Sequence, residues 1–212
     1  MIDVLSRSLT GQSLTISNFP PRKEIRGLGL TDPHSIASRL AEKFDYQNTY
    51  FHQSPHLDIA AELDPARLNS YDFVISSEVF EHVVPPVSRA FANTFGLLKP
   101  GGLLVLTVPY GIQQSTIEHF PRLHDFTIEK TNNGFILKNR TQEGTTEIFE
   151  HLVFHSGPGT TLEMRVFSED DLLRRLADAG FTGIEIHRPT QFRFGIWWPQ
   201  AWSLPISARK PA

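Results

Sequence analysis

Residues 71–111 carry the clearest pattern of apolar and polar segments in the chain. Val74, Ile75 and their neighbours form a short apolar run, and Ser76, Ser77 and Glu78 follow it directly. In open α/β sheets, ligands bind in the crevice beyond the carboxyl ends of the strands. We therefore predict a buried strand here, with polar groups at its carboxyl end.

A helix and a second strand follow in the same segment. Apolar residues recur at near-helical spacing, which predicts an amphipathic helix lying on the sheet: Val87, Phe91, Phe95 and Leu98. Gly101 and Gly102 end this helix. Residues 103–108 are too apolar to alternate, which is typical of a central parallel strand covered on both faces.

The segment resembles class I S-adenosylmethionine-dependent methyltransferases, of the methyltransferase type 11 kind. The matching pieces are YDFVISSEVFEHV and LLKPGGLLVLTVP. The resemblance implies an α/β Rossmann-like methyltransferase fold: a mostly parallel central sheet flanked by helices, a β-hairpin insertion after the fifth strand and an antiparallel C-terminal hairpin. It implies S-adenosylmethionine as the cofactor if the pocket is complete, with the methionine end held by Ser76, Ser77, Glu78 and Val79.

Two acidic residues nearer the N-terminus extend the resemblance. Residues 25–30 predict a strand that ends at Asp32, where the resemblance implies a carboxylate that accepts hydrogen bonds from the ribose hydroxyls. Further along, it implies that Asp58 meets the adenine amino group, with Ile59 stacking beside it. Each has an alternative role, because Asp32 could cap the following helix and Asp58 could cap a turn.

The elements around these acids are also predicted from the apolar pattern. Residues 35–44 carry apolar side chains on one face and predict a helix, and a third strand is expected around residues 48–53. Residues 1–9 resemble the helix that should follow the family's first strand.

The family's first motif, a glycine-rich turn after its first strand, is not recognisable. In that motif the missing side chains let the backbone approach the cofactor. Gly27 and Gly29 form a GxG, but Asp32 stands where a third glycine would complete GxGxxG. We assign both glycines to the second strand. Either the chain starts inside the fold, or cofactor binding is altered or lost.

Length, charge and cysteine content narrow the class of protein. The chain has 212 residues, 40% of them hydrophobic, which predicts one domain over residues 1–212. A net charge of −3 gives no general attraction to nucleic acid or to anionic membranes. The absence of cysteine removes disulfides and thiolate ligands. No apolar run approaches the roughly 20 residues that span a bilayer, and we expect a cytoplasmic protein with a small-molecule substrate.

Residues 112–166 are too long for an ordinary loop and predict an insertion with structure of its own. Strand-like alternation over residues 126–137 and 147–154 favours a small antiparallel sheet. The resemblance makes the insertion the cover of the substrate. A helix capped by Ser168 and a strand over residues 181–187 then return the chain to the main sheet.

The nine histidines raise two possible uses. A metal site could form if His151 and His155 met the group of His119, His124 and Asp125. We favour the alternative, in which they are structural or line a substrate pocket, and predict no metal. Three of the histidines are candidates for orienting a substrate or taking its proton: His82, His119 and His155.

Aromatic residues gather near the C-terminus: Phe192, Phe194, Trp197, Trp198 and Trp202. They either pack on the core, which we favour, or form an exposed patch for a protein partner or a second copy of the chain. Three functions follow: a methyltransferase acting on a small molecule, a methyltransferase-like partner or scaffold module without cofactor, and, least favoured, a histidine-dependent metalloenzyme on another scaffold.

Overall fold

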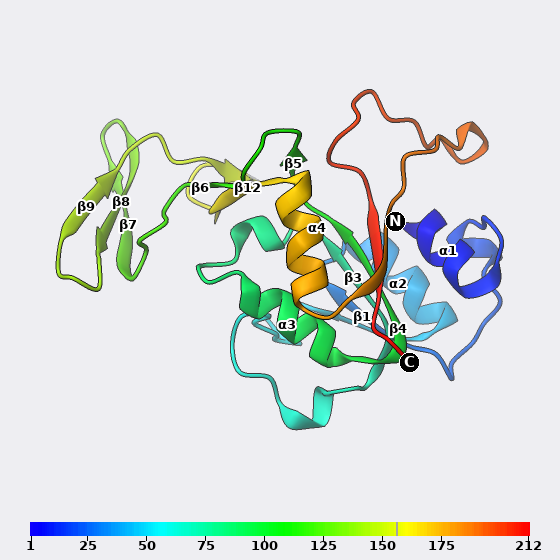
Figure 1. The fold of residues 1–212 in the computed structure, drawn as a ribbon. Helices are drawn as coiled ribbons and strands as arrows, with labels where there is room; N and C mark the ends of the chain where they lie inside the picture. Colours follow the sequence, from blue (N-terminus) through cyan, green and yellow to red (C-terminus); the bar gives the residue numbers. More distant parts are fainter. Residues whose placement is uncertain (156) are drawn as a thin grey trace.

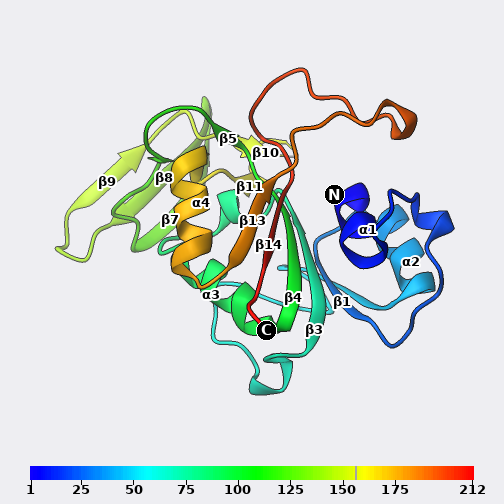
Figure 2. The ribbon, with the colours of Figure 1, turned by 45° about the vertical axis from the view of Figure 1, so that its right-hand side comes forward.

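A six-stranded sheet forms the body of the protein in a computed structural model, which describes residues 1–155 and 157–212. The spatial order is β13-β14-β4-β3-β1-β2; β4, β3 and β1 are labelled in Figure 1, and β13 and β14 in Figure 2. Strands β2, β1, β3 and β4 are parallel to their neighbours in this set, and β14 is antiparallel to β4 and β13. The strands are β1 (Arg26–Leu30), β2 (Asp45–Thr49), β3 (Tyr71–Ser77), β4 (Leu98–Thr107), β13 (Thr182–Ile186) and β14 (Ile206–Arg209). The predicted α/β sheet and its antiparallel C-terminal hairpin are confirmed.

Helices cover both faces of this sheet and explain why its central strands are so apolar. The helices are α1 (Ile2–Thr10), α2 (His34–Lys43), α3 (Ser88–Leu97) and α4 (Glu169–Asp178). One core cluster joins Phe91 of α3 and Leu172 of α4 to the sheet, and another joins Leu5 of α1 and Leu40 of α2 to the opposite face. Successive β3 residues serve different clusters, since Val74 belongs to the first and Ile75 to the second. Both faces of the strand are therefore buried.

The position of β1 corrects the strand assignment made from the sequence. We expected residues 25–30 to be the second strand and the first strand to be missing. Instead, β1 is hydrogen-bonded directly to β3 on one side and to β2 on the other. In a doubly wound sheet with the strand order 3-2-1-4, the first strand lies between the second and the fourth. β1 has that position, because it lies between β2 and β3. The helix after it is α2, whereas residues 1–9 form the separate helix α1.

The next strand also lies earlier than predicted. We expected it around residues 48–53, and β2 runs over Asp45–Thr49. Its sequence DYQNT is largely polar, because β2 is an edge strand of the sheet, and this polarity hid it from a search for apolar runs. Among the described residues, no helix is long and apolar enough to cross a membrane.

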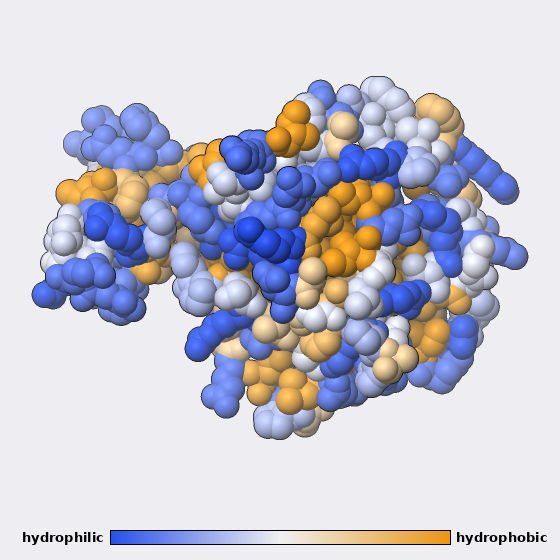
Figure 3. Space-filling view, viewed as in Figure 1, coloured by the Kyte–Doolittle hydropathy of each residue, from blue (hydrophilic) through white to orange (hydrophobic). Residues whose placement is uncertain are grey.

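The insertion leaves the sheet after β4 and forms small sheets of its own. The antiparallel sheet β7-β8-β9 stands apart from the body, and Figure 3 shows hydrophilic side chains over its outer ends. A second small sheet, β5-β12-β6, lies where the insertion returns to α4. The bounds are β5 (Tyr110–Gly111), β6 (Ile117–Glu118), β7 (Asp125–Thr131), β8 (Gly134–Arg140), β9 (Thr146–Phe149), β10 (Phe154–His155), β11 (Thr161–Leu162) and β12 (Arg165–Ser168).

The aromatic segment near the C-terminus lies largely outside the core. It extends from the sheet between β13 and β14 (Figure 2). Trp198 packs against the main core cluster. Phe192, Trp197 and Trp202 are exposed, so the prediction that the aromatic residues pack on the core is wrong for these three.

Candidate functional site

The carboxyl end of β3 carries the residues predicted for the methionine end of the cofactor. Ser76 is completely buried, and its hydroxyl has no hydrogen-bond partner in the described part of the chain. The Ser77 hydroxyl lies 3.1 Å from that of Thr107 on β4. Glu78 is exposed, has a φ of 53° and donates its backbone N–H to the Thr107 carbonyl over 2.8 Å. The backbone therefore turns in a left-handed conformation after β3, and within the described residues one buried hydroxyl at its end stays without a partner.

Asp32, the predicted ribose ligand, lies at the end of β1 rather than after the second strand. Its side chain is buried and accepts a hydrogen bond from the Tyr46 hydroxyl of β2. Burial raises the pKa of Asp32 to about 6, and the bond from Tyr46 opposes that rise. The helix-cap alternative is wrong, because Pro33 is the N-cap of α2 and no side chain caps it.

The loop after β1 contains Thr31, Asp32 and Pro33, with no glycine. Asn48 holds this loop, since its side-chain oxygen accepts the Asp32 N–H over 3.0 Å and its amide donates to the Asp32 carbonyl over 2.8 Å. A Cβ added at Gly29 would collide with Tyr46 and Asp32. The space above β1, left open in the family's glycine motif, is therefore filled by the chain's own polar side chains.

Asp58 caps its own turn, as the alternative to its adenine role predicted. Its Oδ1 atom accepts the Ala60 N–H over 2.8 Å. Ile59 is buried, and its carbonyl accepts a hydrogen bond of 2.7 Å from the Asn93 side chain. The cap uses one of the two carboxylate oxygens of Asp58.

A second group of polar residues lies where β12 returns against the 3₁₀ helix η3 (Phe80–His82). Glu81 is fully buried, and desolvation raises its pKa to about 8. Its Oε1 atom is 3.4 Å from Nε2 of His82 and 3.9 Å from Nδ1 of His155. Burial lowers the pKa of His82. Two of the three candidate catalytic histidines therefore meet one buried carboxyl group.

Glu163 brings in the third candidate histidine. Its two carboxylate oxygens each lie 2.9 Å from an imidazole nitrogen, one from Nε2 of His119 and one from Nε2 of His155. The backbone of the same segment is fixed to η3, because the Met164 N–H donates to the Glu81 carbonyl over 2.8 Å. The structure thus brings together His82, His119 and His155.

Arg165 is fully buried and fastens this segment of the insertion to η3. Its Nη1 atom donates to the carbonyls of Phe80 and Val83 over 2.8 and 2.6 Å. Its Nε atom lies 3.0 Å from both carboxylate oxygens of Glu118. Glu163 and Arg165 were not predicted from the sequence, although two charged residues beside the start of an otherwise buried strand are a signal for a buried polar contact.

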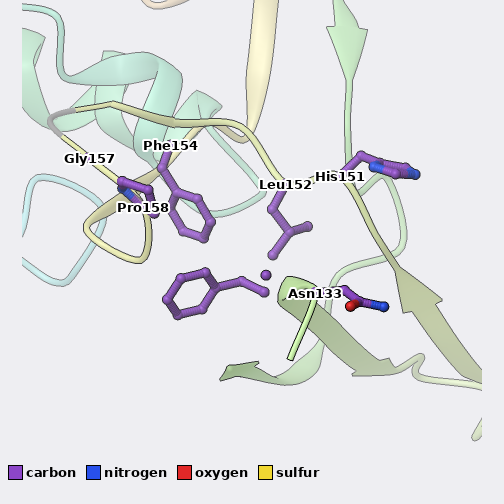
Figure 4. A pocket seen from close by; sticks show the side chains of 8 residues that line it. Asn133, His151, Leu152, Phe154, Gly157 and Pro158 are labelled. Carbon is purple, nitrogen blue, oxygen red and sulfur yellow. The ribbon is translucent and has the colours of Figure 1, made fainter. Parts of the chain in front are cut away.

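The other members of the metal group that was considered and disfavoured from the sequence lie elsewhere. The His124 N–H donates to Asn139 within the insertion. His151 lines a cavity in the insertion beside Leu152 and Phe154 (Figure 4). Asp125 is exposed at the start of β7. The combination proposed from sequence spacing does not form.

Comparisons with known proteins agree with this architecture. Residues 28–186 match a family model described as a methyltransferase domain. No curated protein matches the chain. A solved Burkholderia thailandensis 1,6-didemethyltoxoflavin-N1-methyltransferase, with bound 1,6-didemethyltoxoflavin and S-adenosylhomocysteine, is 15% identical, with a TM-score of 0.51 over 100% of this chain and 77% of its own. The sugar N-methyltransferase KedS8 of a Streptoalloteichus species is 13% identical, with a TM-score of 0.52 over 89% of this chain and 81% of its own.

Proposed function

The chain belongs to the methyltransferase-domain family, and we propose that it transfers a methyl group from S-adenosylmethionine to a small-molecule acceptor. The observation that carries the proposal is the family match over residues 28–186, which spans the sheet from β1 to β13. When bound, the cofactor supplies a methyl group already activated by its sulfonium, so the protein mainly aligns the reactants.

The fit of the cofactor differs between the two sides of the sheet edge. On the β3 side, Ser76, Ser77 and Val79 lie where the methionine end is expected, and within the described residues the buried Ser76 hydroxyl has no protein partner. On the β1 side, Asp32 is occupied by Tyr46. We therefore assign cofactor binding mainly to the β3 side, with the free oxygen of Asp58 and the side chain of Ile59 at the adenine end.

We propose that the insertion over residues 112–166 covers the methyl acceptor and that the chain forms a single domain. Support comes from the way its return segment is fixed to η3 through Met164 and Arg165. We propose that His119, together with His82 and His155, orients the acceptor or takes its proton, since Glu163 links His119 to His155 and the His155 ring contacts that of His82. We also keep the prediction that the reaction is cytoplasmic and involves no nucleic acid.

Calorimetric titration of the full chain with S-adenosylmethionine and S-adenosylhomocysteine tests the cofactor assignment. We expect binding, weakened about tenfold or more in Asp58→Ala. The matched control is Asp64→Ala, because Asp64 makes the same kind of turn cap, accepting the Ala66 N–H over 2.9 Å. Absence of heat at high micromolar ligand would overturn the proposal, and equal weakening in both variants would remove Asp58 from the site.

A second candidate function is a partner or scaffold module without cofactor. It is favoured by the glycine-free loop after β1 and by the exposed Phe192, Trp197 and Trp202, which offer an apolar surface to a protein partner or a second copy. Concentration-dependent association that is lost in Trp197→Ala, together with silent calorimetry, would support this candidate over the first.

A further inference from the structure

We propose that Glu81, His82 and His155 form a binding site for a divalent transition-metal ion of the zinc class. The inference goes beyond the proposed function and does not depend on it, because it concerns ion binding alone. The three residues come from η3 and β10, which are separated by most of the insertion.

The distances between the three ligand atoms are close to those in a metal site. One carboxylate oxygen of Glu81 and one ring nitrogen from each histidine all lie within 4.8 Å of one another. Atoms bound to one tetrahedral zinc at about 2.0–2.1 Å lie roughly 3.3–3.4 Å apart. The Glu81 to His82 distance of 3.4 Å already matches this value, and the Glu81 to His155 distance of 3.9 Å needs a small contraction.

The hydrogen bonds of the two imidazole rings show which nitrogen of each ring carries the hydrogen. Nδ1 of His82 lies 2.9 Å from the Leu162 carbonyl oxygen, which can only accept, so Nδ1 carries the hydrogen. Nε2 of His155 lies 2.9 Å from Glu163 and donates to that carboxylate. In the neutral rings, the other nitrogens therefore hold lone pairs: Nε2 of His82 and Nδ1 of His155. These are the two atoms that approach Glu81.

The outer contacts of both rings also match those of metal-bound histidines. Such a histidine almost always donates its second N–H to a backbone carbonyl or a carboxylate, which fixes the tautomer and the ring orientation. His82 uses the Leu162 carbonyl and His155 uses Glu163. The rings lie perpendicular to each other, with centroids 4.6 Å apart.

Among the residues that the structure describes, the buried carboxyl group of Glu81 lacks the hydrogen bonds that burial of a polar group requires. Within the described residues, neither carboxylate oxygen has a hydrogen-bond partner, although the side chain is fully buried. Arg165 directs its Nε and Nη1 hydrogens to Glu118 and to two backbone carbonyls, and its buried Nη2 atom makes no hydrogen bond in the described part of the chain, so Arg165 donates none to Glu81. A buried carboxyl group facing two lone pairs requires a cation or a proton between them.

The donor set selects the class of ion. Two imidazole nitrogens suit zinc and its transition-metal neighbours better than magnesium or calcium, which prefer oxygen ligands. Three protein ligands would leave a fourth position for water or for an oxygen of a substrate, as in catalytic zinc sites.

The test is metal binding by the full chain after removal of bound metal with a chelator. We expect one Zn²⁺ ion per chain in calorimetry and in elemental analysis, and visible absorption bands of low-symmetry Co²⁺ when cobalt replaces zinc. Glu81→Gln and His155→Ala should each weaken binding at least tenfold, and Glu163→Gln by about 10–100-fold through the outer contact of His155.

His151→Ala is the matched control, because His151 lies on an exposed part of the same insertion and should leave binding unchanged. Circular dichroism of each variant separates lost folding from lost binding, and His155→Ala serves if Glu81→Gln does not fold. Absence of stoichiometric metal would overturn the site in favour of a proton shared by Glu81 and His82. Unchanged affinity in folded His155→Ala, or an equal loss in His151→Ala, would also overturn it.

Discussion

The two halves of the sheet edge are built in opposite ways. At the end of β3, the buried Ser76 hydroxyl has no hydrogen-bond partner among the described residues, and Glu78 takes a left-handed backbone conformation with a φ of 53°. Beyond β1, Tyr46, Asp32 and Asn48 satisfy one another and fill the space above Gly29. Within the part of the chain that the structure describes, the β3 half leaves a buried polar group unpaired, whereas in the β1 half the polar groups are hydrogen-bonded to one another.

This difference shows that the fold and the ligand edge have separate requirements. The sheet needs β1 and β3 to be apolar and covered on both faces, and both strands meet that need. The shape of the edge depends on a few residues after each strand, and these can change while the strands stay. Family membership therefore fixes the sheet more firmly than it fixes the β1 half of its edge.

The largest effect is expected from Arg165→Met, which removes the attachment of the insertion to the β3 half. The change leaves Glu118 and the carbonyls of Phe80 and Val83 without their donor. Breaking a buried ion pair by removing one partner costs about 3–5 kcal/mol, so the free energy of unfolding in urea should fall by that amount.

Arg174→Met is the control for this loss. Arg174 also pairs with a carboxylate, Asp171, but its side chain is 69% exposed. An exposed pair contributes about 0–1 kcal/mol. Similar losses in the two variants would show that Arg165 does not hold the insertion in place.

Asp32→Asn, in the β1 half, should give the next largest effect: it should reduce the dependence of the free energy of unfolding on pH. The folded-state pKa of Asp32 is raised from 3.8 to about 6, so the folded protein binds this proton more tightly than the unfolded chain. The resulting stability is complete below pH 3.8 and is lost as the pH rises through 6. At 1.36 kcal/mol per pKa unit, the loss is about 3 kcal/mol.

Urea unfolding between about pH 4 and pH 8 measures this slope. The wild-type chain should show the decline, and Asp32→Asn should reduce it. Tyr46→Phe removes the bond that lowers the pKa of Asp32 and should extend the decline to higher pH. An unchanged slope in Asp32→Asn would mean that the buried carboxyl group is not the source.

The sequence predicted the β3, α3 and β4 elements well because their apolar patterns are long and regular. It placed β1 wrongly, since a strand with two glycines and no glycine turn after it does not reveal which position in the sheet it takes. The cluster around Glu81 was recognised only in part. Glu163 and Arg165 lie far from Glu81 along the chain, and only the return of the insertion onto η3 brings them there.

The smallest effect is expected from glycine substitutions at the first residue of each edge loop. Thr31 follows β1 with a φ of 62°, and Glu78 follows β3 with a φ of 53°. This left-handed region is costly for a β-branched residue and free for glycine. We expect Thr31→Gly to stabilise the protein by about 0.5 kcal/mol and Glu78→Gly to be nearly neutral.

If the side chains after β1 limit ligand approach, Thr31→Gly should also raise S-adenosylhomocysteine affinity a few-fold, measured by calorimetry, whereas Glu78→Gly should not. Equal affinities in the two variants would show that the Thr31 side chain does not limit ligand approach.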